Sequence, residues 1–428
     1  MVKPTKLQLL AMGERLRARR EQLGKTQPET AQDLSDIVWE RHRKRVAIAG
    51  DKVSKWERGE CRPIPLYREA YRVYYNASDE DLGFRGATRA APLASIGAAA
   101  PPQLDLFLLE PLDATLRPVD EGYVGSVRDT VSALVTLDNL FGGDDLSALA
   151  VRAFRAAYRR LGAGRYEAGI DLDLQAATGE LAEVAAWMLY DADNQAAARQ
   201  LNQEALLLSR LSGDRAMELL ILQNMSMQAG CLGRPQEALQ LVTVVLDTSR
   251  LSPRVQALFT IREARARAQL GEHTDAPRAF AKARSLFQDG VADTDPAWVW
   301  WVTERELAWH EAMCLAGLGD WRRAVELFRQ AAEGCPVDLN RTRYNDLAHL
   351  LLALVEVGAW RETEPVITQT LPYVGEVGSR RTAVLLMGAG KRIVNASASP
   401  PSTRDAAIHL LELLKTAGYE SNTKDQID

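Results

Sequence analysis

The sequence predicts an all-α protein with a small basic N-terminal domain and a large acidic helical body. Its 428 residues are 46% hydrophobic and 25% charged, which is ordinary for a globular chain that buries a sizeable core. Alanine, leucine and arginine are abundant and β-branched runs are scarce, a composition that favours helix. Apolar residues also recur at helical spacing through most of the chain.

Charge divides the chain in the same way. Residues 1–75 hold 17 Lys and Arg against 10 Asp and Glu, a net charge of +7, and the remainder holds 35 against 47, a net charge of −12. A basic head attracts polyanions, whereas an acidic body repels them. The alternative interpretation is a chance fluctuation of surface charge.

Residues 1–84 are predicted to form a compact helical domain. The segment "LQLLAMGERLRARREQLG" places Leu9, Leu16 and Leu23 on one helical face before a glycine stop. A second helix begins in "TQPETAQDLSDIVW", with Thr26 as N-cap and Pro28 in the first turn, where proline is tolerated.

Two more helices complete this domain. The segment "DKVSKWERGE" carries Lys52 and Lys55 on one side and Val53 and Trp56 on the other, and Gly59 ends it. The lysines are either merely solvated or directed at something negatively charged. The last helix, in "PLYREAYRVYY", is expected to bury Leu66, Ala70 and Val73 in the core.

Residues 85–122 are predicted to be a linker, and residues 123–415 a helical-repeat body. The linker segment "RGATRAAPLASIGAAAPPQ" is small, contains proline and lacks periodicity. In the body, similar units recur, with turns at Ala192, Gly233, Gly271, Gly319 and Gly358. Their spacings of 41, 38, 48 and 39 residues are typical of stacked helix–turn–helix repeats.

The unit "LGDWRRAVELFRQAAEGCP" is the sharpest of these repeats. Its glycine, tryptophan, alanine, phenylalanine and proline fall at the spacings of a tetratricopeptide repeat, and the chain resembles that family over roughly residues 180–375. The resemblance implies a right-handed α-solenoid. The alternative is a non-repetitive helical array that reuses one kind of turn.

The N-terminal domain resembles the Cro/CI-type (XRE) family over about residues 12–84. The resemblance rests on the Thr-Gln helix start and the later run "SKWERG". It implies a lambda-repressor-like helix-turn-helix, in which one helix braces and the next reads the DNA major groove. Together with the repeat body, the layout is similar to actinobacterial regulators and to peptide-sensing quorum regulators.

The same resemblance implies roles for individual residues. Gln27 would lie at a helix N-terminus against the phosphate backbone. Asp51, Lys52 and Lys55 would face the groove, where lysine donates to guanine and aspartate accepts from cytosine.

Arginines after the reading helix have a different expected role. Arg58 and Arg62 would contact phosphate, which positions the domain without reading sequence. Arg20 and Glu57 match a helix-bridging ion pair of the family and are predicted to be structural.

One departure from the family lies between Gln27 and Glu57. These residues are 30 positions apart, roughly a dozen more than a compact helix-turn-helix needs. The extra segment, within residues 35–48, is expected to extend the second helix and add a basic connection. Arg43 and Lys44 would then bind phosphate beside the site, or else belong to a solvated charge run.

The body offers a candidate ligand groove. Trp298 and Trp301 lie in the aromatic run "AWVWW", and either pack between repeats or line a groove. Asn224 and Asn345 lie on repeat helices and could hydrogen-bond an extended peptide, although ordinary exposed amides are the simpler interpretation for each.

Catalysis, metal binding and cofactors are not expected. The four cysteines are scattered without ligand spacing, so no disulfide or structural zinc is predicted and a reducing cytoplasm fits. "GAGKR" lacks the first glycine of a P-loop, and the five histidines, dispersed, are expected to be surface or satisfied helix residues. No membrane-spanning segment is expected.

The sequence therefore predicts a cytoplasmic, homodimeric transcriptional regulator that binds double-stranded DNA at an inverted repeat. Its body would sense a peptide, a small molecule or a protein partner. The competing interpretation is a repeat-protein adaptor whose basic head binds DNA only nonspecifically.

Overall fold

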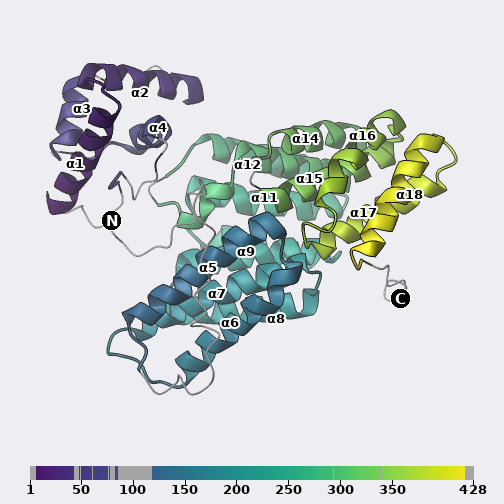
Figure 1. Ribbon diagram of the computed structural model, residues 1–428, viewed down its shortest axis with the longest axis horizontal. Helices are drawn as coiled ribbons and strands as arrows, with labels where there is room; N and C mark the ends of the chain where they lie inside the picture. The colour runs from purple at the N-terminus through teal and green to yellow at the C-terminus, as the bar shows by residue number, and fades with distance from the viewer. Residues whose placement is uncertain are drawn as a thin grey trace. The chain divides into compact units, whose positions relative to one another are not determined.

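The computed structural model describes residues 6–42, 48, 50–59, 61–75, 77, 82–84, 118–292, 294–336 and 339–419. These residues form eighteen α-helices, and the only β pairing among them is an isolated bridge between Val119 and Tyr166 (Figure 1). The all-α prediction is confirmed. The chain divides into two compact units, Met1–Ala98 with Val291–Ala297, and Ala99–Gly290 with Trp298–Asp428. Most of the predicted linker lies outside the described residues.

The N-terminal unit contains α1 (Lys6–Gln22), α2 (Gln27–His42), α3 (Gly50–Glu57) and α4 (Pro65–Tyr75). Trp56 is 2% exposed, and its ring lies 5.5 Å from Tyr67 and 5.7 Å from Tyr71 between centroids. Aromatic side chains from α3 and α4 therefore fill the centre of this small core.

The structure differs from the predicted core of this unit in two details. Leu16 is fully buried, but Leu23 lies at the exposed end of α1 with 53% of its surface accessible. On α4, Ala70 is buried as predicted, whereas Val73 is exposed and its neighbours Tyr71 and Tyr75 are buried instead. Leu66 is among the residues whose side chains are not described. Tyrosine rings reach further into the core than valine does, so the buried face of α4 is shifted.

The C-terminal unit contains the remaining helices. They are α5 (Glu121–Phe141), α6 (Asp144–Gly162), α7 (Asp171–Asp191), α8 (Gln195–Ser212), α9 (Arg215–Cys231), α10 (Pro235–Thr248), α11 (Pro253–Gln269), α12 (Asp275–Gln288), α13 (Glu304–Gly317), α14 (Trp321–Glu333), α15 (Asn340–Val357), α16 (Trp360–Thr370), α17 (Arg380–Asn395) and α18 (Pro401–Thr416), with short 3₁₀ segments Ala297–Trp301 and Leu371–Tyr373.

Each predicted turn joins two packed helices of this unit. At Gly233, Gly271, Gly319 and Gly358 the backbone is left-handed, with φ between 67° and 81°. Glycine adopts this conformation without steric cost, so the chain reverses directly after the preceding helix. The pairs α7–α8, α11–α12 and α13–α14 pack closely along their lengths.

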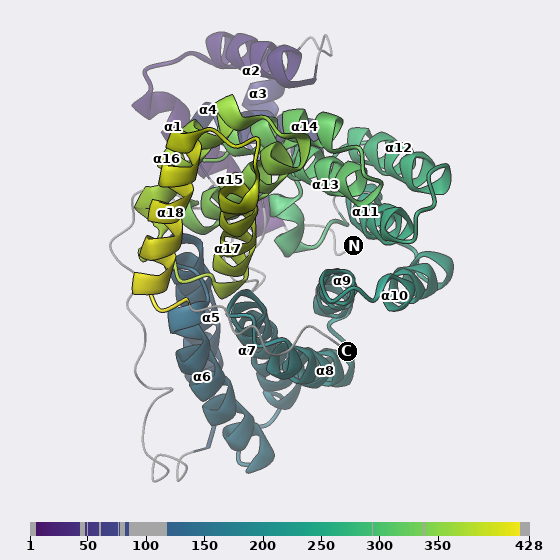
Figure 2. The same cartoon turned by 90° about the vertical axis from the view of Figure 1, so that its right-hand side faces the viewer.

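The helices of the C-terminal unit follow a curved path that returns to its beginning. Figure 2 shows α7, α9, α11, α13, α15 and α17 in a curved row, with α8, α10, α12 and α14 outside them. We call the six helices of the row the inner helices. α5 packs against α15, and α17 packs against α7, so helices from the beginning of the unit contact helices near its end.

Buried polar contacts join these ends. Ser379 Oγ donates to Asp191 Oδ1 at 2.8 Å, and the Gly143 N–H donates to Asp191 Oδ2 at 3.2 Å. Arg341 Nε lies 3.0 Å from Asp138 Oδ2. Since Asp191 is fully buried, its two oxygens tie the start of α6 to the start of α17.

The four cysteines are free thiols. Over the described ranges, none of the helices is long and apolar enough to cross a bilayer.

Candidate functional site

The candidate nucleic-acid interface begins where α2 begins. Thr26 and Glu29 cap this helix reciprocally, because the Thr26 N–H donates to Glu29 Oε2 at 2.7 Å and the Glu29 N–H donates to Thr26 Oγ1 at 3.4 Å. The Thr26 N-cap is thus present as predicted. Gln27 is the first residue of α2, which is the place that the sequence predicts for it.

Helix α3 presents two chemically different faces. Val53 and Trp56 are buried, as predicted, while Asp51, Lys52 and Lys55 are exposed. Three charged side chains with hydrogen-bonding ends therefore project from the side of α3 that does not pack on the core. A short helix with this arrangement can offer donors and an acceptor to a polyanion.

The Lys52 side chain also has a neighbour on α4. Its ammonium lies 5.0 Å from the centroid of the Tyr67 ring, a cation–π distance. Because Tyr67 is buried and packs on Trp56, its ring is fixed, and the contact limits the movement of the Lys52 side chain.

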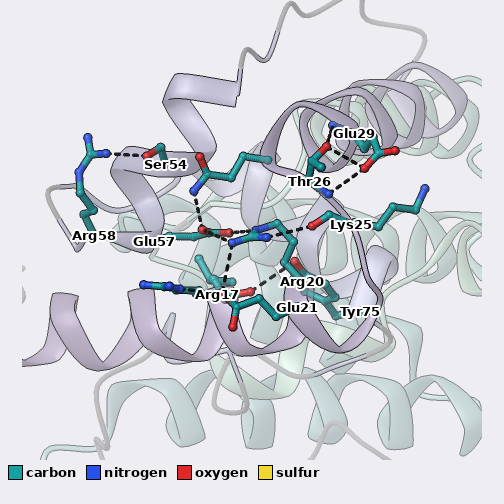
Figure 3. A network of polar contacts seen from close by, with 12 residues as sticks. Arg17, Arg20, Glu21, Lys25, Thr26, Glu29, Ser54, Glu57, Arg58 and Tyr75 are labelled. Carbon is teal, nitrogen blue, oxygen red and sulfur yellow. Dashed lines mark hydrogen bonds and ion pairs between the residues drawn. The ribbon is translucent and has the colours of Figure 1, made fainter.

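An ion-pair network fixes the rear of α3 against α1, as Figure 3 shows. Arg20 Nε donates to Glu57 Oε1 at 2.6 Å and Arg20 Nη2 donates to Glu57 Oε2 at 3.0 Å. The ion pair predicted between these residues is present. Arg20 Nη1 also donates to the Lys25 carbonyl at 2.9 Å, so the network reaches the connection before α2.

Gln27 belongs to the same network. Its amide nitrogen donates to Glu57 Oε2 at 2.8 Å, which turns this end of the side chain toward the protein. The buried carboxylate of Glu57 therefore accepts from side chains at the end of α1 and the start of α2. Sequence spacing did not reveal that Gln27 would share this acceptor.

The helices approach each other closely at two glycines. A Cβ on Gly13 would lie 2.3 Å from the Glu57 carbonyl oxygen, and one on Gly50 would lie 3.1 Å from Pro28. The first contact brings α1 against the end of α3, and the second brings the starts of α2 and α3 together.

The other predicted phosphate contacts divide into described and undescribed residues. Arg58 is exposed, and its Nη1 donates to Ser54 Oγ at 2.5 Å. Arg62 is half-buried. Arg43 and Lys44 lie outside the described residues.

The inserted segment lengthens α2, which continues to His42. Ile48 then returns to the core with 8% of its surface exposed, and its N–H lies 3.3 Å from Ser35 Oγ, which accepts the bond. The predicted extension of the second helix is therefore present.

In the C-terminal unit the tryptophans of the predicted groove pack in the interior. Trp298 is 4% exposed, and its Nε1 donates to the Ala216 carbonyl at 2.8 Å. Trp301 is half-buried and packs against the same core. The packing interpretation holds for both, and the aromatic-wall interpretation is wrong for Trp298, because its indole N–H is already used inside the protein.

Asn224 and Asn345 are not ordinary exposed amides. Asn224 is 9% exposed, and its Nδ2 donates to Glu183 Oε1 at 2.8 Å. The Oδ1 atom of Asn345 is buried and accepts no hydrogen bond from the described residues. Burial raises the pKa of Glu183 to about 8, so this carboxyl group is protonated at neutral pH.

From Asn224 the polar contacts continue across the inner helices. Gln223 Nε2 donates to Asn224 Oδ1 at 2.5 Å, and Gln223 Oε1 accepts from Arg262 Nη2 at 2.8 Å. Arg262 Nη1 lies 3.3 Å from His310 Nε2. We call Glu183, Asn224, Gln223, Arg262 and His310 the inner polar row, which runs from α7 to α13.

Sequence reasoning missed most of this row. Arg262 lies in "IREARARAQL", which has the composition of a solvated helix, and no spacing signal marks it for burial. His310 and His349 are also buried, at 3% and 9% exposed, so the surface alternative for them is wrong. The rings of Trp309 and His349 lie 5.1 Å apart between centroids, which extends the contacts to α15.

No protein-family model and no curated protein matches this chain.

Proposed function

We propose that the protein is a sequence-specific DNA-binding transcriptional regulator. In this proposal α2 and α3 form a lambda-repressor-like helix-turn-helix, and α3 enters the major groove. The observation that carries it is the two-faced α3, whose exposed Asp51, Lys52 and Lys55 lie opposite the buried Val53 and Trp56. In the major groove this face would supply donors and an acceptor to base edges.

The ion-pair network supports the same proposal. Sequence reading requires side chains to be held in a fixed orientation, because base-edge hydrogen bonds are directional. Arg20 and Gln27 both bind Glu57 at the end of α3, and the cap at Thr26 defines where α2 begins. These contacts would keep the exposed residues of α3 in a constant position relative to α2.

We propose that the C-terminal unit is a tetratricopeptide-like, right-handed solenoid that dimerises and senses a ligand. Helix pairs with left-handed glycine turns at Gly233, Gly271, Gly319 and Gly358 support the repeat assignment. A symmetric dimer would place two heads on half-sites about one helical turn apart, ~34 Å, or a multiple of that. A ligand could regulate such a protein by binding one geometry of the heads better than another.

The test is selection of bound sequences from a random DNA pool by the purified full-length protein. Salt at ~150 mM suppresses nonspecific phosphate binding during the selection. Enrichment of an inverted repeat is the expected result, and its half-site spacing would report the geometry of the dimer.

The competing adaptor function predicts a different result. A head that is merely basic would bind DNA with a strong salt dependence but would enrich no sequence. A specific reader is expected to hold its site roughly 10³-fold or more tighter than random DNA. Binding without enrichment would therefore overturn the proposal and favour the adaptor.

A further inference from the structure

Arg262 on α11 is a buried cation that forms no ion pair with the carboxylates of the described residues. Arg262 is only 4% exposed. Its Nε and Nη2 both donate to Oε1 of the neutral Gln223, at 3.1 and 2.8 Å. Burial lowers the pKa of Arg262 to about 9, so the guanidinium remains cationic at neutral pH. A buried charge of this kind is unfavourable unless an opposite charge is supplied.

The neighbouring His310 offers a donor. A guanidinium N–H can only donate, so His310 Nε2, at 3.3 Å from Arg262 Nη1, must accept. Burial and the nearby Arg262 lower the pKa of His310 well below its ordinary value, which keeps the ring neutral with its proton on Nδ1. That Nδ1–H is buried, and within the described structure nothing accepts from it.

Arg265 and Trp309 add a second cation and a second donor. The guanidinium of the half-buried Arg265 lies 5.4 Å from the centre of the Trp309 ring and forms no ion pair with any described carboxylate. Trp309 is 9% exposed, and its Nε1–H has no acceptor in the part of the chain that the structure describes. The rings of Trp309 and His310 are 4.9 Å apart, so these groups form one cluster.

The same unit supplies carboxylates where a buried arginine has a structural partner. Arg305, on the same helix as His310, lies 2.5 Å from Asp346 Oδ2 and also contacts Glu306. Arg381 lies 3.6 Å from Asp191. Arg262 and Arg265 differ from these arginines because neither forms an ion pair with a described carboxylate. Glu306 Oε2 lies 3.7 Å from His310 Nε2, but this carboxylate is already paired with Arg305.

We infer that Arg262, Arg265, Trp309 and His310 form a binding site for a small oxyanion, the carboxylate or phosphate group of a ligand. All four contribute a cation or an N–H donor, and an oxyanion would satisfy both needs. Guanidinium groups bind such oxygens with paired, charge-assisted hydrogen bonds. The ring of Trp309 would lie against the remainder of the ligand.

This inference deepens the ligand-sensing part of the proposed function and rests on it only for its regulatory meaning. Its test uses no DNA, so the two can fail separately. Anion binding without sequence enrichment would refute the DNA-reading function and support the anion site. Sequence enrichment without anion binding would support the DNA-reading function and refute the anion site.

The experiment measures the thermal unfolding of the full-length protein with inorganic phosphate, with benzoate, or with chloride at the same ionic strength. A ligand that binds the folded protein raises the unfolding temperature with concentration. Calorimetric titration then gives the dissociation constants. Phosphate and benzoate distinguish the two sources of the oxyanion.

The decisive variant is Arg265→Gln, because Arg265 is half-buried and, among the described residues, has no ion pair whose loss would destabilise the fold. Binding should weaken roughly 10- to 100-fold, the usual effect of losing a hydrogen bond from a charged group. Arg262→Gln should do the same if it folds. Arg199→Gln is the matched control, since Arg199 pairs with Glu237 at 2.5 Å on the outer helices, and it should leave binding unchanged.

Two results would overturn the inference. One is that neither phosphate nor benzoate raises the unfolding temperature of the wild-type protein above the chloride control. The other is that Arg265→Gln binds the anion as tightly as the Arg199→Gln control does.

Discussion

The guanidinium of Arg20, on α1, holds both oxygens of the Glu57 carboxylate at the end of α3, at 2.6 and 3.0 Å. Both side chains are largely removed from water, with 12% and 3% of their surfaces accessible. The pair therefore differs from the exposed one between Arg17 and Glu21 on the same helix. Its position makes this buried pair one of the contacts that fix the orientation of α3.

Arg20→Met is expected to destabilise the N-terminal unit by about 3–5 kcal/mol, because it leaves the Glu57 carboxylate buried without a counter-ion. Hydrogen exchange of α1–α4 peptides in the full-length protein measures this loss. Arg17→Gln is the control and should leave protection nearly unchanged, since both members of its ion pair are exposed. Equal protection in the two variants would contradict the structural role of Arg20.

Gly13→Ala should also loosen α1 from α3. The added Cβ would lie 2.3 Å from the Glu57 carbonyl oxygen, so the helices must separate, at a cost of roughly 1–3 kcal/mol. Gly388→Ala on α17 is the contrasting substitution, because nothing lies within 4 Å of its Cβ position, and it should stabilise its helix by up to about 1 kcal/mol. Thermal unfolding of both variants tests the pair, and a stabilising Gly13→Ala would refute the close approach.

Lys52→Ala should reduce the discrimination between an operator and random DNA by roughly tenfold or more, because a lysine that donates to a base edge contributes to specificity. Arg43→Ala, by contrast, should weaken binding to both DNAs about equally, as loss of a phosphate contact does. Competition binding at one fixed salt concentration separates the two effects. Unchanged discrimination in Lys52→Ala would mean that α3 does not read sequence with this residue.

Asp191→Asn should loosen the contact between α7 and α17 in the C-terminal unit. The substitution leaves Arg381 without its carboxylate partner and weakens the acceptor for Ser379. Breaking a buried ion pair in this way should lower the free energy of unfolding by about 3–5 kcal/mol. Faster hydrogen exchange in α17 and α7 is the expected readout. Arg392→Gln on α17 breaks an exposed pair with Glu356 and should change exchange little, and a similar effect of both variants would argue against the role of Asp191.

Glu183→Gln should change how stability depends on pH. The folded protein holds the Glu183 proton up to a pKa of about 8, whereas the unfolded chain releases it near 4.5. Between these values the folded state binds more protons, so wild-type stability falls as pH rises, by up to about 1.4 kcal/mol per pH unit. The glutamine variant lacks this slope and should gain on the wild type from pH 5 to pH 8. Parallel stability curves from denaturant titrations over that range would contradict the assignment.

Local order was predictable from the sequence because its causes are local. Helical periodicity, the Thr26 cap and the glycine turns at Gly233, Gly271, Gly319 and Gly358 each act within a few residues. The two faces of α3 likewise follow from the spacing of its own side chains, and the structure has them as predicted.

Which side chains meet was decided only by tertiary packing. The Gln27 bond to Glu57, the contact of α17 with α7 and the burial of Arg262 all join residues distant in sequence. Burial of a charge depends on the neighbours that the whole fold assembles around it, and an arginine in a helical run has the same sequence signature in water as in a core. The periodicity of this chain thus determined its helices and turns. The packing of the inner helices determined that Arg262 and Arg265 lie away from the described carboxylates.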